Sequence, residues 1–475
     1  MLAKRFRIWI KDGLRFLRSK APRALCHSSR WRREYDRFSA LLASSASKSP
    51  EELRADQNKR LRELIAYAYE NVPYYRQLFD EKGLDPAKVQ GIEDLACLPF
   101  LTKDIIRREG DRMLSRAIPK EEMVIHETGG SSGKPVKFYF EKDLDDAREA
   151  AFVDHIYSRI GYDKRERTVT FAIFDDSRFL REAEAAGYGR VGKKYPGKPL
   201  WIFSYALVAT RAEDYAEELK WVDPLWMKGM PSALYHLTRA LQDKGIPNPM
   251  PHLKGLILNS EMLYPHQKAL LESYYGVPIL HFYGHTEHAC VAGTCEKGLR
   301  FHLQPEYGIA EFIPFEGEKK ELIATGLHNR AMPLIRYQTR DLFTLSDTPC
   351  SCGRPYQMID SIEGRATDLL YLKNGAVVSD VFCDFATLPN SWLSRVSMFQ
   401  IEQREKGKCL LKLVPAEGET LSPKALAEIQ KSVETYFFDQ MDVEAVVVDS
   451  IPKTGRGKEK LILSLVKEEG KEETP

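Results

Sequence analysis

The sequence predicts a mixed α/β (α+β) fold, with a large N-terminal domain of several layers and a small C-terminal α+β domain. Its 475 residues exceed the roughly 100–200 residues of one ordinary domain, so two or more domains are expected. Strand-like and helix-like runs alternate from about residue 124, which is typical of layered α/β folds, and the pattern changes after about residue 365. We therefore expect an extension over residues 1–50, a large domain over 51–365 and a small domain over 366–475.

The composition is that of an ordinary globular protein, with 43% hydrophobic and 29% charged residues. This balance excludes the collagen-like, disordered and disulfide-scaffold classes. The net charge of +2 is unevenly spread, because residues 1–33 carry +10 and the remainder carries −8. A basic head on a mildly acidic body is not the pattern of a nucleic-acid-binding fold, so no nucleic-acid partner is expected.

The basic head has the pattern of an amphipathic helix. On a helical wheel of residues 2–18, aliphatic and aromatic side chains share one face, and lysines and arginines share the other. Such a helix either lies on an anionic membrane surface or packs on the body with its basic side in water. The sequence leaves both alternatives open: residues 1–33 either make peripheral contact with a membrane or pack on the body of the protein.

The sequence predicts no membrane span, because no apolar run approaches the ~18–20 residues that a span requires. Basic residues also interrupt every stretch that could serve as the apolar region of a secretory signal. We therefore expect a cytoplasmic protein, either free or peripheral to the inner face of the membrane. In that compartment the eight cysteines stay reduced.

The elements of the large domain follow from hydrophobic periodicity. A helical pattern runs through Leu61, Leu64, Ile65 and Ala68. Further along, β-branched and aromatic runs alternate with runs of helical period. The strands are expected at 136–140, 255–258, 277–281 and 320–325, and the helices at 143–160, 211–221, 231–243 and 265–275.

The small domain has the pattern of a β-β-α-β unit. Strand-like runs at 396–402 and 409–414 precede a helix, and another strand-like run follows it at 443–448. Ser422 is expected as the N-cap of that helix and Pro423 as its first residue. The apolar face of the helix carries Leu426, Ile429, Val433 and Phe437.

The most informative segment is Thr128-Gly-Gly-Ser-Ser-Gly-Lys-Pro135. Its glycines let the backbone turn N–H groups toward an anion, and its hydroxyls and Lys134 add donors, which are the ingredients of a phosphate-binding loop. It is not a P-loop, because Thr128 and Pro135 stand where that motif requires Gly and Ser/Thr. The flanking patterns indicate strand–loop–strand, and taken alone the segment is also typical of a surface hairpin.

Further segments carry the chemistry that a nucleotide site requires. Tyr283-Gly-His-Thr-Glu287 follows a strand-like run and offers a ring, a hydroxyl and a carboxylate suited to Mg²⁺. Asp341 follows another strand, where a carboxylate can accept both ribose hydroxyls. Gly364-Arg365 and Asp368 lie at the supposed domain junction, and Lys458 lies beside Gly457 near the C-terminus. Each of these segments, taken alone, is also common on solvated surfaces.

The order and spacing of these segments resemble the adenylate-forming superfamily of acyl-CoA synthetases, adenylation modules and luciferases. The resemblance covers about residues 55–465. The stretches LRELIAYAYENVPYYRQLFDEKGL, LPFLTKDIIR and RYQTRDL, with the Cys-x-Cys-Gly at 350–353, are similar to the branch of the phenylacetate–CoA ligases and their CapK-like relatives in capsular polysaccharide biosynthesis.

The resemblance implies a nucleotide-binding role for most of the motif residues. The adenine pocket would be lined by Ser260, Glu261, Tyr283 and Gly284, and Asp341 would bind the ribose. The loop that would hold the β- and γ-phosphates of ATP consists of Thr128, Gly129, Gly130, Ser131, Ser132, Gly133 and Lys134.

The resemblance likewise implies the catalytic residues. Thr286 would contact the α-phosphate, and Glu287 would ligate Mg²⁺. Lys458 would bridge the substrate carboxylate and the α-phosphate, where its charge would offset the repulsion between two anions. Arg365 would assist near the hinge, and Asp368 matches the position about which a mobile C-terminal domain rotates.

The reaction implied by the resemblance is the ATP-dependent adenylation of a carboxylic acid, for which aryl acids such as phenylacetate are candidates. Pyrophosphate would leave, and the acyl group of the acyl-AMP would pass to coenzyme A. One alternative is an enzyme of capsular or envelope polysaccharide assembly that transfers to a sugar or carrier at the membrane surface. Another is a non-enzymatic nucleotide-binding partner, against which the intact Glu287, Asp341 and Lys458 argue. A homodimer is one possible assembly.

The chain departs from the superfamily pattern at several positions. Gly129 replaces the usual Ser or Thr of the phosphate loop, and Ser132 replaces Thr but keeps a hydroxyl. Arg340 replaces the Gly before Asp341, and Thr367 stands where many relatives have Asp, which bears on the hinge assignment. No charged catalytic position is missing.

One group of cysteines suggests a metal site. Cys295, His302, Cys350 and Cys352 supply three thiolates and an imidazole, which form a closed tetrahedral set for structural Zn²⁺. The alternative is a group of unpaired cysteines in loops, with Cys290 as a competing ligand. Resemblance to metal-bearing members of the branch favours zinc.

Overall fold

The fold is seen in a computed structural model, which describes residues 28–127, 136–172, 192–194, 199–204, 211–263, 265–315, 317–365, 370–374, 377–378, 392–415, 419–437, 439–451 and 462–466. The basic helix expected at 2–18 lies outside these residues, as do the phosphate-loop residues 128–134, Asp368 and Lys458.

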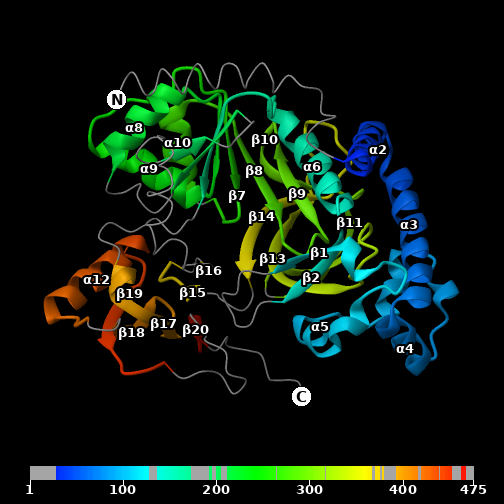
Figure 1. The fold of residues 1–475 in the computed structure, drawn as a ribbon. Helices are drawn as coiled ribbons and strands as arrows, with labels where there is room; N and C mark the ends of the chain where they lie inside the picture. The colour runs from blue at the N-terminus through cyan, green and yellow to red at the C-terminus, as the bar shows by residue number, and fades with distance from the viewer. Residues whose placement is uncertain are drawn as a thin grey trace. The chain divides into compact units, whose positions relative to one another are not determined.

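The described residues form two compact units, drawn in Figure 1. The larger unit contains the described parts of 1–128, 136–339 and 343–362. The smaller contains residues 340–342 and the described parts of 363–475. Both combine helices with strands, so the predicted α/β (α+β) class is confirmed. The expected boundaries of the extension and of the two domains remain predictions.

The larger unit is built on one mixed sheet of twelve strands in the order β11-β12-β13-β14-β10-β9-β8-β7-β6-β3-β5-β4. Strands β5, β3, β6, β7 and β8 run parallel. The pairs β4–β5, β8–β9, β9–β10, β10–β14 and β11–β12 are antiparallel. The bounds are β3 Thr168–Ala172, β4 Gly192–Lys194, β5 Leu200–Ser204, β6 Trp226–Gly229, β7 Gly255–Asn259, β8 Ile279–Gly284, β9 Val291–Cys295, β10 Gly298–Leu303, β11 Gly308–Pro314, β12 Lys319–Gly326, β13 Tyr337–Ser346 and β14 Met358–Arg365.

Helices cover both faces of the parallel strands (Figure 1). Leu256 and Leu258 of β7 pack with one group of helices, and Ile257 between them packs with the other, as the twofold alternation of a strand requires. The first group is α8 Ala212–Val222, α9 Pro231–Asp243 and α10 Pro265–Tyr275, and the second is α2 Ser29–Ser45 and α6 Leu144–Tyr157.

The N-terminal part of the larger unit packs on a third hydrophobic core. The helix α3 begins with a capping box, in which Ser49 and Glu52 each satisfy a backbone N–H of the other. The antiparallel hairpin β1 Met123–Glu127 and β2 Lys137–Glu141 joins the same core. The remaining helices of this part are α3 Pro50–Asn71, α4 Pro73–Lys82 and α5 Lys103–Glu109, with short 3₁₀ helices at Pro86–Lys88, Ile92–Cys97, Gly110–Met113, Lys120–Glu122 and Ser158–Ile160.

The smaller unit contains a four-stranded sheet in the order β19-β18-β17-β20 with one helix, α12 Pro423–Tyr436. The predicted N-cap is confirmed, since the Ser422 side chain accepts a hydrogen bond from the backbone N–H of Ala425. Of the expected apolar face, Ile429, Val433 and Phe437 are buried. The other elements are β15 Leu370–Tyr371, β16 Val377–Val378, a 3₁₀ helix at Trp392–Arg395, β17 Val396–Glu405, β18 Lys408–Pro415, β19 Asp442–Val447 and β20 Ile462–Ser464.

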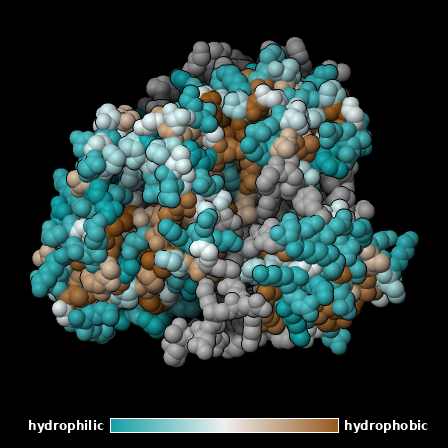
Figure 2. All heavy atoms as spheres, turned by 180° about the vertical axis from the view of Figure 1, so that it is seen from behind, coloured by the Kyte–Doolittle hydropathy of each residue, from teal (hydrophilic) through white to brown (hydrophobic). Residues whose placement is uncertain are grey.

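The sequence located the expected strands and helices to within a few residues. The largest shift concerns the strand expected at 277–281, which is β8 and continues to Gly284, so Tyr283 lies on the strand rather than after it. Figure 2 shows a largely hydrophilic surface on the face that it draws. None of the helices among the described residues combines the length and the hydropathy that a membrane crossing requires.

Candidate functional site

The C-terminal ends of the adjacent parallel strands β7 and β8 bring two predicted segments to one edge of the sheet. Asn259 pairs with Phe282, so Ser260 and Glu261 leave β7 beside the point where Tyr283 ends β8. The buried His281 of β8 donates from Nε2 to the backbone oxygen of Glu261 at 2.8 Å, which joins the two segments. Ligands of open α/β sheets bind outside the carboxyl ends of the strands, at such an edge.

A tight turn follows β8 and presents Glu287. The backbone N–H of His288 donates to the oxygen of His285 at 3.0 Å and closes the turn. The turn packs on two glycines, because a Cβ at Gly308 would lie 2.0 Å from the oxygen of Ala289 and one at Gly326 would lie 3.3 Å from its Cα. Larger residues at these positions would displace the turn that carries Glu287.

Glu287 is buried and ionised. Tyr337 donates its hydroxyl to Oε1 at 2.6 Å, Lys103 Nζ lies 3.3 Å from the same oxygen, and His285 Nδ1 lies 3.3 Å from Oε2. Burial alone raises the pKa of this carboxyl, but His285, Lys103 and Tyr337 outweigh burial and hold it well below its ordinary value of 4.5. The turn therefore places a fixed negative charge beside the edge of the sheet.

Lys103 and Tyr337 reach Glu287 through backbone pairing between two segments that are distant from the turn in sequence. Leu101 donates to the oxygen of Arg336 and accepts from Gln338, each at 2.9 Å, so the segment before α5 lies parallel to the start of β13. The side chain of Arg336 also donates to Leu98 O. This isolated bridge holds the start of α5, which carries Lys103, beside the start of β13, which carries Tyr337.

The structure also places the other described residues of the predicted nucleotide site, each within its own element. Tyr283 is half-buried, and its ring meets Phe343 edge-on at 5.2 Å between centroids. Asp341 lies on β13 after Arg340, whose φ of 68° falls in the left-handed region that favours glycine. Thr286 is half-buried in the turn, and Arg365 ends β14.

The four predicted zinc ligands meet in space. Cys295 ends β9, His302 lies on β10, and Cys350 and Cys352 lie in the loop between β13 and β14. Their ligand atoms all lie within 4.8 Å of one another, with 3.6 Å between the sulfurs of Cys295 and Cys350 and 3.6 Å from Cys352 Sγ to His302 Nε2. Cys290, the competing ligand, is buried and is not part of this group.

Sequence reasoning missed three members of the Glu287 site. It used the segments that contain Lys103 and Tyr337 only as marks of a family branch, and it gave His285 no role. No local signal identifies Lys103 and Tyr337, because their approach to Glu287 depends on pairing between Leu101 and the start of β13, more than two hundred positions apart. His285 lies two positions before Glu287 in the same turn, so its place in the sequence was a signal that could have identified it. A buried acid predicted as a metal ligand is itself a signal, since it requires cationic or hydroxyl partners somewhere in the chain.

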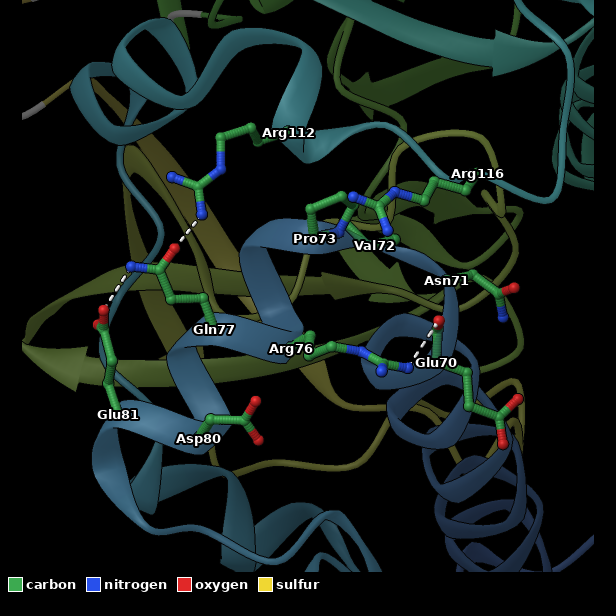
Figure 3. A pocket seen from close by; sticks show the side chains of 10 residues that line it. All are labelled: Glu70, Asn71, Val72, Pro73, Arg76, Gln77, Asp80, Glu81, Arg112 and Arg116. Atoms are coloured by element: carbon green, nitrogen blue, oxygen red, sulfur yellow. Dashed lines mark hydrogen bonds between the residues drawn. The ribbon is translucent and has the colours of Figure 1, made fainter.

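A separate cavity of about 310 Å³ lies between the end of α3, α4 and the segment 112–116 (Figure 3). Its polar side chains are hydrogen-bonded within the lining. Gln77 accepts from Arg112 and donates to Glu81, and Arg76 donates to the oxygen of Glu70 at 3.1 Å. None of the predicted site residues lines it, so this surface cavity is not the candidate site.

Known proteins are similar to this chain along most of its length. The phenylacetate-coenzyme A ligase of Thermus thermophilus is 29% identical over 337 residues, 68% of this chain and 72% of that protein. Protein CapK of Staphylococcus aureus is 22% identical over 412 residues, 86% of this chain and 89% of that protein. A crystal structure of 2-hydroxyisobutyryl-CoA ligase in the postadenylation state covers 88% of this chain and 91% of that one, with 19% identity and a TM-score of 0.58. No family model matches the chain.

We predict that Tyr337→Phe destabilises the larger unit by about 1–3 kcal/mol, because a buried carboxylate loses its shortest hydrogen bond. Denaturant unfolding in buffer without divalent cations measures the loss. Tyr69→Phe is the matched control, since its hydroxyl donates at 3.0 Å to Asp80 on an exposed surface, and we expect a change of less than about 0.5 kcal/mol. Equal stability of Tyr337→Phe and the natural chain would show that Glu287 does not depend on this bond.

Proposed function

We propose that the chain is an AMP-forming acid–CoA ligase of the adenylate-forming superfamily, because it is similar along most of its length to phenylacetate–CoA ligases and to CapK. It would couple a carboxylic acid to ATP as an acyl-AMP, release pyrophosphate and pass the acyl group to coenzyme A. The observation that carries the proposal is the ionised Glu287 in a chain with this similarity. Its turn lies at the sheet edge that also holds Ser260, Glu261 and Tyr283.

In the first step, an oxygen of the acid attacks the α-phosphorus of ATP, and the bond from that phosphorus to the bridging oxygen breaks as pyrophosphate leaves. Two anions must approach each other, and cations and N–H donors in a water-poor site offset their repulsion. We propose that three parts of the chain offset this repulsion: the loop 128–134, Thr286 at the α-phosphate, and Lys458. Tyr283 would lie against adenine with Gly284, and Asp341 would hold the ribose.

A magnesium ion fits the chemistry of Glu287. Magnesium in such sites takes one or two carboxylates together with substrate phosphates, and Glu287 offers one ionised carboxylate. When bound, the ion would neutralise phosphate charge. Lys103, His285 and Tyr337 would keep the carboxylate ionised and oriented for it.

In the second step, the thiolate of coenzyme A attacks the acyl carbon, and AMP leaves with the electrons of the broken carbon–oxygen bond. Lys458 serves only the first step, so a mobile C-terminal domain can carry it in and withdraw it. Arg365 and Asp368 would mark the hinge. Lys458, which is needed in only one half-reaction, would thus lie on the domain that moves.

The acid is proposed to be an arylacetic or related acid, on the strength of the phenylacetate–CoA ligases among the relatives. Transfer to a sugar or carrier in envelope polysaccharide assembly is the alternative, which the amphipathic N-terminal pattern and the similarity to CapK support. We also propose that the basic segment 1–33 makes peripheral contact with an anionic membrane, because its charge and amphipathic pattern suit one.

We propose that Cys295, His302, Cys350 and Cys352 hold a structural zinc ion. Three sulfurs and an imidazole within 4.8 Å supply a complete tetrahedral set. Three arginines brace the segments that carry these ligands. Arg354 lies 3.1 Å from Glu296, and Arg159 and Arg300 donate to backbone oxygens of the strands and loop that carry the ligands. The ion would tie the loop between β13 and β14 to β9 and β10.

The purified chain, incubated with ATP, Mg²⁺, coenzyme A and a panel of aryl and aliphatic acids, should form AMP and an acyl-CoA thioester with at least one arylacetic acid. Mass spectrometry of the products measures both. Acid-dependent AMP without a thioester would favour a different acceptor. Absence of AMP across the whole panel would overturn the proposal.

We predict that Lys458→Ala lowers acyl-AMP formation by about 10²–10³-fold, because one charge contact to the transition state is lost. Thioester formation from supplied acyl-AMP and coenzyme A should remain near the rate of the natural chain. Lys460→Ala, two residues away, is the matched control and should affect neither step. Equal loss of both steps in Lys458→Ala would contradict the assignment of this lysine to adenylation alone.

A further inference from the structure

A second group of metal-ligating side chains lies beyond the Glu287 turn. His126 of β1, Asp145 in the first turn of α6 and His288 after the turn place their ligand atoms within 4.8 Å of one another. His288 has a φ of 48°, in the left-handed region. Its side chain contacts Asp145, whereas that of Glu287 contacts Lys103, His285 and Tyr337. Three segments distant in sequence therefore converge on one point.

The spacing of this group suits a cation. Nδ1 of His288 lies 3.1 Å from each carboxylate oxygen of Asp145. Two ligands bound to one zinc ion at about 2.1 Å in a tetrahedron lie roughly 3.4 Å apart, so this pair needs almost no movement. The imidazole of His126 lies edge-on to that of His288 at 5.3 Å between centroids, and both rings pack on Phe140. A ligand nitrogen of His126 lies within 4.8 Å of the ligand atoms of both other residues.

The charges around His288 also favour a cation. Asp145 is buried, and Glu149 lies 3.8 Å from His288 Nδ1, so two carboxylates face this imidazole. Arg148 pairs with Glu141 at 2.9 Å and is farther from Asp145, at 4.0 Å. Glu141 also accepts from the backbone N–H of Arg330, whose guanidinium donates to the backbone oxygen of Glu63 instead.

The same contacts have an interpretation that needs no metal. Burial lowers the pKa of His288, but Glu149 and Asp145 outweigh burial and raise it to about 9, so an ion pair between a protonated His288 and Asp145 also satisfies the site. That ion pair gives no role to the nitrogens of His126. In the ion-pair interpretation His126 is only an aromatic neighbour of Phe140, and this difference makes the two interpretations separable.

We propose that His126, Asp145 and His288 form a binding site for a divalent transition-metal ion. Two imidazoles and one carboxylate are the ligands that zinc, cobalt and nickel accept, and three protein ligands leave a position for water or a further anion. The ion would join the strand that leads into residues 128–134, the start of α6 and the turn that carries Glu287. This site is separate from the cysteine group and does not depend on the proposed reaction.

Cobalt binding by the full-length, untagged chain tests the site. The protein is freed of metal with a chelator, equilibrated with Co²⁺ alone and assayed for cobalt per chain and for its absorption spectrum. We expect His126→Phe, which keeps a ring against Phe140, to bind about one cobalt fewer than the natural chain. Cobalt bound to thiolates gives a charge-transfer band, and the cobalt missing from His126→Phe should not contribute to it. The intensity of that band should therefore be the same in His126→Phe and in the natural chain.

Two further variants make the result decisive. His252→Gln removes an exposed histidine that pairs with Asp223, and it should bind as much cobalt as the natural chain. His126→Gln provides a second way of removing the ligand if the phenylalanine variant does not fold. Equal cobalt content in the His126 variant and the natural chain, or loss of the thiolate band with the lost cobalt, would overturn the proposal.

Discussion

The arrangement of the site depends on one buried ionised carboxylate, that of Glu287. Removing an ion from water costs several kcal/mol, and this cost is offset only where partners are held in place. Lys103, His285 and Tyr337 supply a cation, an imidazole and a hydroxyl from three parts of the chain. The burial of one charge therefore requires the segment before α5, the turn after β8 and the start of β13 to stay together.

Small residues let these parts meet. Gly308 and Gly326 pair with each other on β11 and β12, and the backbone of Ala289 lies against both without room for a side chain. The turn that ends at His288 is thereby held on one side by the sheet and on the other by the side chains that bind Glu287. A rigid scaffold of this kind suits a site in which charge must develop at a fixed position.

The sequence predicted the framework well because the framework rests on local patterns. The apolar run at 255–258 and the Ser422–Pro423 start of α12 are visible within short windows. The cysteine group spans residues 295–352, and its prediction also used resemblance. Long-range pairing was not predictable in the same way. Lys103 reaches Glu287 through the bond pattern of Leu101 with β13, and His126 reaches His288 through a hairpin and a helix. Predictions for residues 128–134 and Lys458 rest on resemblance, and they remain predictions.

The central claim is that this chain adenylates a carboxylic acid at a site organised by Glu287. Acid-dependent exchange of labelled pyrophosphate into ATP tests it most directly, in the natural chain and in Glu287→Gln. The claim predicts exchange with at least one arylacetic acid and a loss of about 10²–10³-fold in the variant, whose fold is checked by circular dichroism. Background exchange in the natural chain across a broad acid panel, or undiminished exchange in folded Glu287→Gln, would contradict it.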